Sequence, residues 1–554
     1  MLSSQRKKIQ STHIVCLLGM ALLSLWPSLS NSAAQPPALP QAYIDTTYSP
    51  PAGKVITVKA GDNLQTAINN ANLGDTIVLQ AGATFTGNFT LPNKTIGSGW
   101  IYIVSGNYAS LPAPGNRVAP TDVANMPQIV SPYGDSGTGT RTAANAHHYR
   151  FVGIAFKPVT GIFLYSLISI GGGETALDAL PHDIIFDRCY IHGDSIAGGR
   201  RGVAMNGASV AVIDSYVSDF KEAGSDTQAL WAYNSPGPLK IANNYLEAAG
   251  ENVMFGGADP KIANLVPSDI EIKRNYFFKP LSWMGSTWTV KNLLEFKNAQ
   301  RVLVEGNRFE NNWPNAQNGF SLLITPKNQD GTAPWVVTQD ITIKSNSMKN
   351  LGSGINISAQ DGDRPIPLTL RTHRVLIQDN VLEVTGLGNA DGRTFQILGG
   401  VTDLTIVHNT AFNTATACCT SLAMLDATPP NDQFIFANNI VSNGVYGFKG
   451  SGTGGGNAAL NHYFTNWQFN NNAIIGENSS VTYPANNYFP ANNTAAGFVN
   501  YAGGDYHLSA SSPYKNAGTD GLDLGANIDA IADISTGVAG TSSLAPPIGL
   551  KVIP

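Results

Sequence analysis

The sequence is poor in charge and rich in residues that form turns. Charged residues make up 13% of the 554 residues, about half of the roughly 25% found in an average soluble domain. Gly (57) and Pro (32) are plentiful, and this composition favours a turn-rich β protein over a helical one. A chain of this length exceeds one ordinary compact core, so we expect either several domains or an extended solenoid.

Cysteine is also scarce. Four cysteines are too few for a disulfide framework in a chain this long. Cys189 falls in a strand pattern and is predicted to be a core residue. Cys418 and Cys419 are adjacent, and we interpret them as two packed thiols, with a strained vicinal disulfide as the alternative. No Cys/His spacing predicts a zinc site.

Long apolar runs are missing too. The N-terminal run IVCLLGMALLSLW holds about 13 residues, whereas a membrane span needs roughly 20. Basic residues from Arg6 to Lys8 precede this run and small residues follow it, so residues 1–34 are predicted to be a signal peptide cleaved near Ala33 or Ala34. We therefore expect a secreted, periplasmic or cell-surface protein whose mature chain has no membrane span.

The charge balance bears on the partner. Removal of the predicted signal peptide leaves 30 basic and 38 acidic residues, a net charge of −8. This charge argues against nucleic acid as a partner. It leaves an anionic polysaccharide open, because a local row of basic residues can act against the net charge.

An internal repeat decides the predicted fold. Segments such as VIDSYV, IANNYL and VEGNRF place apolar residues on alternate positions around a central Asn or small residue. The central residues are Cys189, Ser215, Asn244, Asn275, Asn307, Asn346, Asn380, Asn409, Asn439 and Asn472. Such a period predicts a solenoid whose units bury their apolar faces by stacking. Asn suits the bend because it tolerates left-handed backbone angles, and stacked Asn amides can form a hydrogen-bonded ladder.

A second strand precedes each of these bend strands, in segments such as GVAMNGA, NVMFGGA, LLEFKNA and INISAQD. Coils of this length have room for three short strands, and successive coils would lie about 4.8 Å apart. We predict an all-β solenoid of about ten or more coils over residues 55–530. Residues 35–54 are expected to be a linker, and residues 531–554 a Gly/Ser/Pro-rich tail resembling the first strand of a fibronectin type III domain.

The N-terminal end of the solenoid carries a predicted cap. In AGDNLQTAINNANLGDTIVLQAG, Asp62 is the expected helix N-cap, four apolar residues between Leu64 and Ala71 form one stripe, and Gly74 is expected to stop the helix. This short amphipathic helix would cover the apolar end and the open sheet edge of the first coil. Near the other end, DYHLSASSP and NAGTDGLDLGA have the punctuation of a closing coil.

These features resemble the single-stranded right-handed parallel β-helix proteins of the pectin-lyase-like superfamily. The cap helix leading into GDTIVLQAG, the Asn-bend repeats and the closing segment carry the resemblance, which covers roughly residues 55–530. It implies an exported protein that acts on or binds polysaccharide. The clustered-Asp, Gly-His-Gly and Arg-Ile-Lys motifs of polygalacturonases, the arginine motif of pectate lyases and the Tyr-Gly-Asp-Pro-His signature of alginate epimerases are missing, so no catalytic residues can be carried over.

Candidate catalytic residues lie in the second strands. Stacking of LLEFKN on LLITPK would place Lys297 and Lys327 in adjacent coils. Strand alternation puts Glu295 and Lys297 on one face and the apolar neighbours on the other, so we expect the charged pair to face outward. Glu251, in the nearby GENVMFGGADP, completes the set. Any one of these residues could instead be a solvated strand residue.

Substrate-binding candidates surround this centre. They are Asn298, Asn328, Asn252, Gln228, Trp283, Trp288, Trp313, Trp335 and Arg200. Indole rings stack on sugar faces, although long loops can equally pack their Trp onto the solenoid. The arginine could reach over the groove from a loop or remain solvated.

Two chemistries fit these residues. β-Elimination from a uronic acid needs a base and a cation. Lys297 and Lys327 could divide these roles, while Glu251 and Glu295 tune the lysine pKa values or hold a metal. These residues indicate no particular cofactor, and a bound Ca²⁺ is the alternative cation. Hydrolysis instead needs two carboxylates about 5 to 9.5 Å apart, which could come from Glu251 with Glu295 or from a pair formed by Asp330 and Asp361.

Our first hypothesis is therefore an exported β-helix enzyme that cleaves an acidic polysaccharide by β-elimination, with a glycoside hydrolase as the variant. The competing hypothesis is a non-catalytic glycan-binding or adhesin-like surface rod. The low charge, the fibronectin-like tail and the missing motifs favour the second hypothesis.

Overall fold

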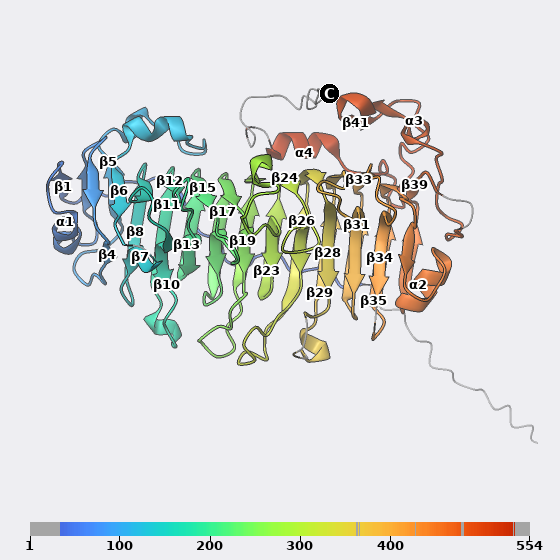
Figure 1. The fold of residues 1–554 in the computed structure, drawn as a ribbon, viewed down its shortest axis with the longest axis horizontal. Coiled ribbons are helices and arrows are strands. Elements are labelled where there is room, and N and C mark those ends of the chain that lie inside the picture. The colour runs from blue at the N-terminus through green and yellow to red at the C-terminus, as the bar shows by residue number, and fades with distance from the viewer. Residues whose placement is uncertain are drawn as a thin grey trace, which may run out of the picture. The chain divides into compact units, whose positions relative to one another are not determined.

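The structure is a computed structural model that describes residues 34–535 and 537, except for 134, 362, 363, 365, 427 and 478–480. The predicted signal peptide, apart from Ala34, lies outside the described residues. The same holds for most of the predicted tail. Figure 1 shows the strands following one another in chain order, from the blue N-terminal strands to the orange C-terminal ones.

Three long parallel sheets contain nearly all of the described strands. The 14-stranded sheet consists of β1 (Val55–Val58), β2 (Thr76–Leu79), β5 (Ile101–Ser105), β8 (His147–Val152), β11 (His182–Asp187), β14 (Ala208–Ile213), β17 (Gly237–Ala242), β20 (Ser268–Lys273), β23 (Ala299–Glu305), β26 (Thr338–Lys344), β29 (His373–Gln378), β32 (Thr402–Val407), β35 (Asp432–Ala437) and β38 (Trp467–Asn470). The 13-stranded sheet consists of β3 (Thr84–Thr86), β6 (Gln128–Ser131), β9 (Ala155–Pro158), β12 (Tyr190–His192), β15 (Tyr216–Phe220), β18 (Tyr245–Ala248), β21 (Tyr276–Phe278), β24 (Arg308–Asn312), β27 (Ser347–Leu351), β30 (Val381–Val384), β33 (Thr410–Asn413), β36 (Ile440–Ser442) and β39 (Ala473–Ile475). The 12-stranded sheet consists of β4 (Thr90–Leu91), β7 (Asp135–Thr142), β10 (Leu164–Gly171), β13 (Arg201–Asn206), β16 (Gln228–Ala232), β19 (Glu251–Phe255), β22 (Leu294–Phe296), β25 (Phe320–Ile324), β28 (Ser353–Ser358), β31 (Arg393–Leu398), β34 (Ser421–Asp426) and β37 (Phe448–Gly450).

Each coil passes through the 14-stranded, then the 13-stranded and then the 12-stranded sheet, as β17, β18 and β19 do. Within these three sheets, neighbouring strands from successive coils pair in parallel, so segments about one period apart become neighbours. The chain is therefore a right-handed parallel β-helix, and the fold implied by the resemblance to the pectin-lyase-like superfamily is confirmed. The prediction of three short strands per coil is also confirmed.

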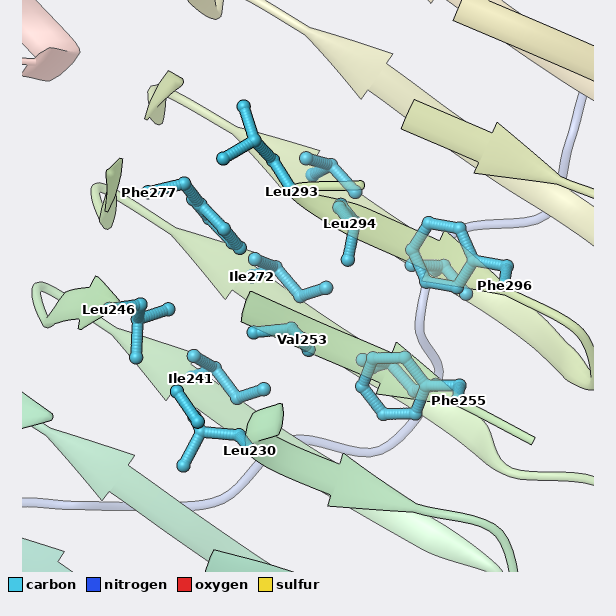
Figure 2. Packing of buried hydrophobic residues seen from close by; sticks show 14 of the residues in the cluster. Leu230, Ile241, Leu246, Val253, Phe255, Ile272, Phe277, Leu293, Leu294 and Phe296 are labelled. Carbon is cyan, nitrogen blue, oxygen red and sulfur yellow. The ribbon is translucent and has the colours of Figure 1, made fainter. Parts of the chain in front are cut away.

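The core is a continuous column of apolar side chains enclosed by the three sheets. Figure 2 shows one section of it, with Ile241 and Ile272 from the 14-stranded sheet, Leu246 and Phe277 from the 13-stranded sheet, and Phe255 from the 12-stranded sheet directed toward one another. Equivalent rings stack between coils. The centroids of Phe255 and Phe296 lie 5.6 Å apart with nearly parallel planes.

The predicted Asn ladder runs along the bend between the 14-stranded and 13-stranded sheets. The backbone N–H of each ladder residue donates to the side-chain oxygen of the next, from Cys189 and Ser215 through Asn472 to Asn487. The predicted ladder of Asn amides is confirmed, but the predicted left-handed backbone at the Asn itself is wrong. The left-handed residue is the one that precedes the ladder position, such as Asn243 (φ 56°) before Asn244.

The helix α1 (Leu64–Asn70) occupies the predicted place, with Leu64 and Ile68 in the core column. Its N-cap is Asn63, whose side chain accepts from the Thr66 N–H at 2.9 Å, and not the expected Asp62. The helix also ends before Gly74, because Ala71 already has an extended backbone. Its role as a cover for the first coil stays a prediction.

The segment 34–48, expected to be part of a linker, lies in contact with the 14-stranded sheet; we call it the strap. Its backbone N–H groups at Gln35, Ala38 and Gln41 donate to the carboxylates of Asp403, Asp340 and Asp269, at 2.8 to 3.0 Å. Further along, Arg150 donates to the carbonyls of Thr46 and Thr47. The strap thus spans several coils.

The remaining helices are α2 (Asn457–Tyr463), α3 (Asn493–Ala496) and α4 (Ile528–Ser535), and a small antiparallel pair is formed by β40 (Phe498–Asn500) and β41 (Asp505–Leu508). Helix α4 contains residue 531, the predicted start of the tail, and buries Ile531. Among the described residues, no helix has the length and apolarity that a membrane crossing requires.

The cysteines follow the predictions in part. Cys189 is fully buried in the core, and burial raises the pKa of its thiol to about 12. Cys418 and Cys419 are free thiols, as interpreted, but Cys418 is exposed. They are therefore not packed inside the protein.

Candidate functional site

The candidate groove lies on the outer face of the 12-stranded sheet, at β22, β25, β28 and β31. In these strands Leu294 and Phe296, and their equivalents in the next coils, point into the core. The residues between them face outward and are in register, as Glu295, Leu323, Asn356 and Gln396. Strand alternation thus generates one row of outward side chains, one from each coil.

This row forms part of the lining of a groove of about 440 Å³. The groove is rich in amides and hydroxyls and is lined by Glu295, Ala316, Gln317, Asn318, Phe320, Leu323, Thr325, Asn356, Ser358, Gln360, Asp361, Gln396 and Leu398. Amides and carboxylates together can bond the many hydroxyls of a sugar chain. The buried hydroxyl of Thr325 has no hydrogen-bond partner among the described residues.

Glu295 and Lys297 form an ion pair at this site, with Lys297 Nζ 3.2 Å from Glu295 Oε1. Both residues are on the outer face, as predicted, but they are buried: Glu295 is 1% exposed and Lys297 8%. The expectation that an outward position is a solvated one is therefore wrong here. Burial alone would lower the pKa of Lys297, but the carboxylates of Glu295 and Glu251 outweigh it, and the net pKa is raised.

Glu251 is completely buried beside this pair. Its Oε2 accepts from Gln228 Nε2 at 2.8 Å, and its Oε1 lies 3.8 Å from Lys291 Nζ with no hydrogen bond. Burial, together with repulsion from Glu295, raises the pKa of Glu251. Neither Glu251 nor Gln228 lines the groove, so these two residues can act on a ligand only through the charges next to them.

Lys327 lies in the coil after Lys297, and its backbone N–H donates to the Lys297 carbonyl at 3.0 Å. Its side chain is 30% exposed and pairs with Asp361 at 2.9 Å. The two lysines are therefore adjacent, as expected from the period, but Lys327 is more exposed to solvent than Lys297. The suggested pair of Asp330 with Asp361 is divided between two cavities: Asp330 lines a separate one with Asp259, whereas Asp361 lines the groove.

Three of the predicted substrate-binding amides are occupied by the protein's own backbone. Asn298 accepts from the Val337 N–H and donates to the Leu265 carbonyl, and Asn328 accepts from the Ala333 N–H. Asn252 is buried, and its amide donates to the carbonyls of Leu246 and Phe278. These side chains fix loops and strand ends beside the groove, which leaves little capacity for a ligand.

No sequence pattern singled out Lys279, which is fully buried next to Asn252. Its ammonium donates to the carbonyls of Ala248, Ala249 and Gly250 and to the Asn252 side chain, at 2.6 to 3.0 Å. Burial lowers the pKa of this lysine. Because the ammonium is surrounded by protein acceptors, Lys279 holds the turn that leads into β19.

The predicted tryptophans separate into two groups. Trp283, Trp288 and Trp313 pack together in one cluster with Val290, with Trp283 and Trp313 buried and Trp288 half-buried. This arrangement is the alternative in which loops pack their rings onto the solenoid. Trp335 differs, because it lines the separate cavity beside Asp259 and Asp330.

Arg200 is engaged within the protein. It forms a bidentate ion pair with Glu222, with both N–O distances 2.6 Å, and lies over the ring of Tyr165. The hydrogen bonds that Arg200 donates to Glu222 raise the pKa of the guanidinium. Its side chain is about a quarter exposed, so a ligand could reach it only beside Glu222.

Sequence reasoning missed the amide-lined groove itself. The predicted amides Asn298 and Asn328 lie after the strands end, whereas the groove row begins at the middle residue of each strand. The signal was present in LLEFK, INIS and FQIL, where one polar residue stands between two core residues.

Comparison with known proteins gives no family. No family model matches the chain. No curated protein matches it either. Solved structures with some likeness include an alginate lyase from Paenibacillus sp. (14% identity, 73% of this chain and 97% of that one, TM-score 0.30). A mannuronic acid specific polysaccharide family 6 lyase from human gut microbiota (13%, 79% and 91%, 0.47) and an α-1,3-glucanase from Streptomyces thermodiastaticus (12%, 81% and 71%, 0.44) are others. Since these TM-scores are below 0.5, the fold assignment rests on the three sheets described above.

Proposed function

We propose that the chain binds an acidic polysaccharide in the groove on the 12-stranded sheet and cleaves it by β-elimination. The observation that carries the proposal is the stacking of Lys327 on Lys297 beside that groove. Elimination requires a positive charge near the uronate carboxylate and a base for the neighbouring proton. Neither lysine lines the groove itself, but each pairs with a carboxylate that does, Lys297 with Glu295 and Lys327 with Asp361, and the two together would supply both.

The environments of the lysines divide the roles. The raised pKa of Lys297 keeps its ammonium charged, because the Glu295 carboxylate stabilises the cation by more than burial destabilises it. Lys297 is therefore assigned to electrostatic stabilisation. Lys327 is the more exposed of the two and is assigned as the base; it would act as the neutral amine, after its ammonium has given a proton to solvent and has left the ion pair with Asp361. The amides of Gln317, Asn356 and Gln396 would hold the sugar hydroxyls.

A second function is favoured by one observation. Glu295 and Asp361 are carboxylates that line the same groove, and paired carboxylates are the requirement for glycoside hydrolysis. In that case the same groove would bind the glycan, and the lysines would only adjust the protonation of the two acids.

The test is incubation of the purified chain with polygalacturonate, alginate and glycosaminoglycans, with near-ultraviolet absorbance of unsaturated uronate products and reducing ends as readouts. We expect absorbance to rise with one polymer and to fall by about 10²- to 10⁴-fold in Lys327→Ala. The matched control is Lys349→Ala, since Lys349 also pairs with a carboxylate of the adjacent coil, Glu383, but on the 13-stranded sheet.

The other outcomes decide between the alternatives. Reducing ends without unsaturated product, lost in Glu295→Gln and Asp361→Asn, would replace elimination with hydrolysis. Retained binding of a glycan with neither product would indicate the non-catalytic rod. Equal activity in Lys327→Ala and Lys349→Ala would overturn the assignment of the base.

A further inference from the structure

Three histidines and one aspartate meet on the 14-stranded sheet, away from the groove. His147 and His148 begin β8, and His182 and Asp183 begin β11. Because the two strands are in register with His182 opposite His147, one coil of the solenoid brings the two pairs together. A separation of 35 residues in the sequence matches no usual ligand spacing, which is why the sequence alone predicts no metal site here.

The backbone places successive side chains on one side. In a regular strand, neighbouring residues point to opposite faces. His148 and Asp183 instead have left-handed φ angles of 57° and 53°, which break that alternation. The ring centroids of His147 and His148 consequently lie 4.9 Å apart, and the His147 and His182 rings are stacked at the same distance.

The potential ligand atoms converge. His182 Nδ1 lies 2.6 Å and His148 Nδ1 3.8 Å from Asp183 Oδ2. His147 Nδ1 and His148 Nδ1 are 2.8 Å apart, so the two rings share one proton at most between these atoms. The ligand atoms of His148, His182 and Asp183 all lie within 4.8 Å of one another. Ligands around a tetrahedral Zn²⁺ are about 3.3 Å apart, given bonds of about 2.0 Å, so a metal requires only small side-chain shifts.

The carboxylate is also supported from the next coil. Ser209, the second residue of β14, donates its hydroxyl to Asp183 Oδ1 at 2.8 Å. The other oxygen, Oδ2, is the one that faces the histidines. A hydrogen bond to the distal oxygen of a ligating carboxylate is the usual outer-sphere support of a metal site. All three ligand residues named above are half-buried, which leaves a path for an ion.

We propose that His148, His182 and Asp183 bind one divalent transition-metal ion of the Zn²⁺ type through Nδ1, Nδ1 and Oδ2, which leaves one tetrahedral position for water. Imidazole with one carboxylate is a donor set suited to Zn²⁺ and Co²⁺ and not to Ca²⁺ or Mg²⁺, which take oxygen ligands. The ion would link β8 to β11 and, through Ser209, to β14. It would stabilise three consecutive coils, since binding to the folded state alone favours that state.

The test uses the chain without a polyhistidine tag, after treatment with a chelator, titrated with Co²⁺ and then Zn²⁺. We expect one equivalent of Co²⁺ with visible d–d absorption, its displacement by Zn²⁺, and a higher Tm with metal. The fluorescence of Trp100, whose ring lies 5.1 Å from that of His148, should be quenched by Co²⁺. His182→Ala should weaken binding on the order of 100-fold, and Ser209→Ala on the order of 10-fold.

The matched control is His373→Ala. His373 has the same position at the start of β29 in the same sheet, and its Nδ1 contacts only the Arg371 carbonyl among the hydrogen bonds of the described chain. Binding should be unchanged in this variant. Asp183→Asn keeps the size of the side chain and decides the matter if His182→Ala does not fold. Absence of stoichiometric binding, or weak binding that persists in both His182→Ala and Asp183→Asn, would overturn the proposal.

Discussion

Asn307 and Asn346 stand 39 residues apart in the chain, yet the backbone N–H of Asn307 donates to Asn346 Oδ1 at 2.9 Å. The Asn307 amide donates to the same oxygen at 3.0 Å. The Asn346 amide in turn donates to the carbonyls of Val304 and Lys344 and to Asn380. One side chain thus satisfies buried polar groups in three coils.

Asn346→Ala should lower the free energy of unfolding by about 3 kcal/mol, because it leaves several buried donors and acceptors without partners. Denaturant unfolding followed by circular dichroism measures the change. Asn116→Ala, at an exposed loop position, is the control and should change stability by less than about 0.5 kcal/mol. A similar small change for Asn346→Ala would mean that the ladder contributes little.

The ion pairs of Lys297 and Lys327 should differ in their contribution to stability. Lys297→Met leaves the buried carboxylate of Glu295 without its cation and should cost about 3 to 5 kcal/mol. Lys327→Met breaks a partly exposed pair in the next coil and should cost about 1 kcal/mol or less. Unfolding of the two variants and of Lys297→Met/Glu295→Gln measures this difference. The double variant should be less destabilised than the sum of its single changes, and strict additivity would contradict the buried pairing.

Glu251→Gln should alter the pH dependence of stability. Burial raises the pKa of Glu251 above its ordinary value of 4.5. Between pH 4.5 and the raised pKa, the folded state therefore holds a proton that the unfolded state has lost. The stability of the wild type therefore falls as pH rises from 4.5 through neutral pH. Relative to the wild type, the variant should gain about 1.4 kcal/mol for each pH unit within this window. Unfolding at a series of pH values checks this, and a constant difference would show that Glu251 ionises normally.

The strap should loosen in acid. Burial alone would raise the pKa of Asp340, but hydrogen bonds from Arg374 and from the Ala38 N–H outweigh it and lower the pKa below 3.8. The Asp340 carboxylate therefore stabilises the folded state above pH 3.8, and this contribution is lost as the pH falls through the lowered pKa. Asp340→Ala should therefore increase hydrogen exchange of residues 34–48 already at neutral pH. Asp432→Ala is the control, because its hydrogen bonds go to Thr465 and Asn466 and not to the strap. Equal exchange in both variants would contradict the role of Asp340.

The fold could be predicted because the residues that determine it recur once in every coil. A polar residue that must be satisfied inside the protein, such as Asn275 or Asn380, is placed once per coil, and the period is then visible in the sequence. The position of the left-handed residue was missed, because residues as different as Arg274, Ser345 and His408 occupy it. At that position the bend requires a left-handed backbone, but it does not require a particular side chain.

The site was predicted less well, because the sequence does not show which outward-facing side chains are buried. The sequence places Glu295 and Lys297 on the outer face, but it does not show that loops cover them. It also does not show that Asn298 and Asn328 are bonded to loop backbone, since their partners, Val337 and Ala333, depend on the path of loops of unrepeated length. The cluster of His148, His182 and Asp183 was missed because proximity there follows from coil length and not from motif spacing.

A solenoid ordinarily couples each coil to its immediate neighbours, so either end can unravel while the middle persists. The strap changes this, since its contacts reach from Arg150 to Asp403 across the intervening coils. If any one of these strands separates from the sheet, the strap loses a contact, and the strap is also bound to distant coils. The coils under the strap should open and close as one long cooperative unit, flanked by shorter ends that fray independently.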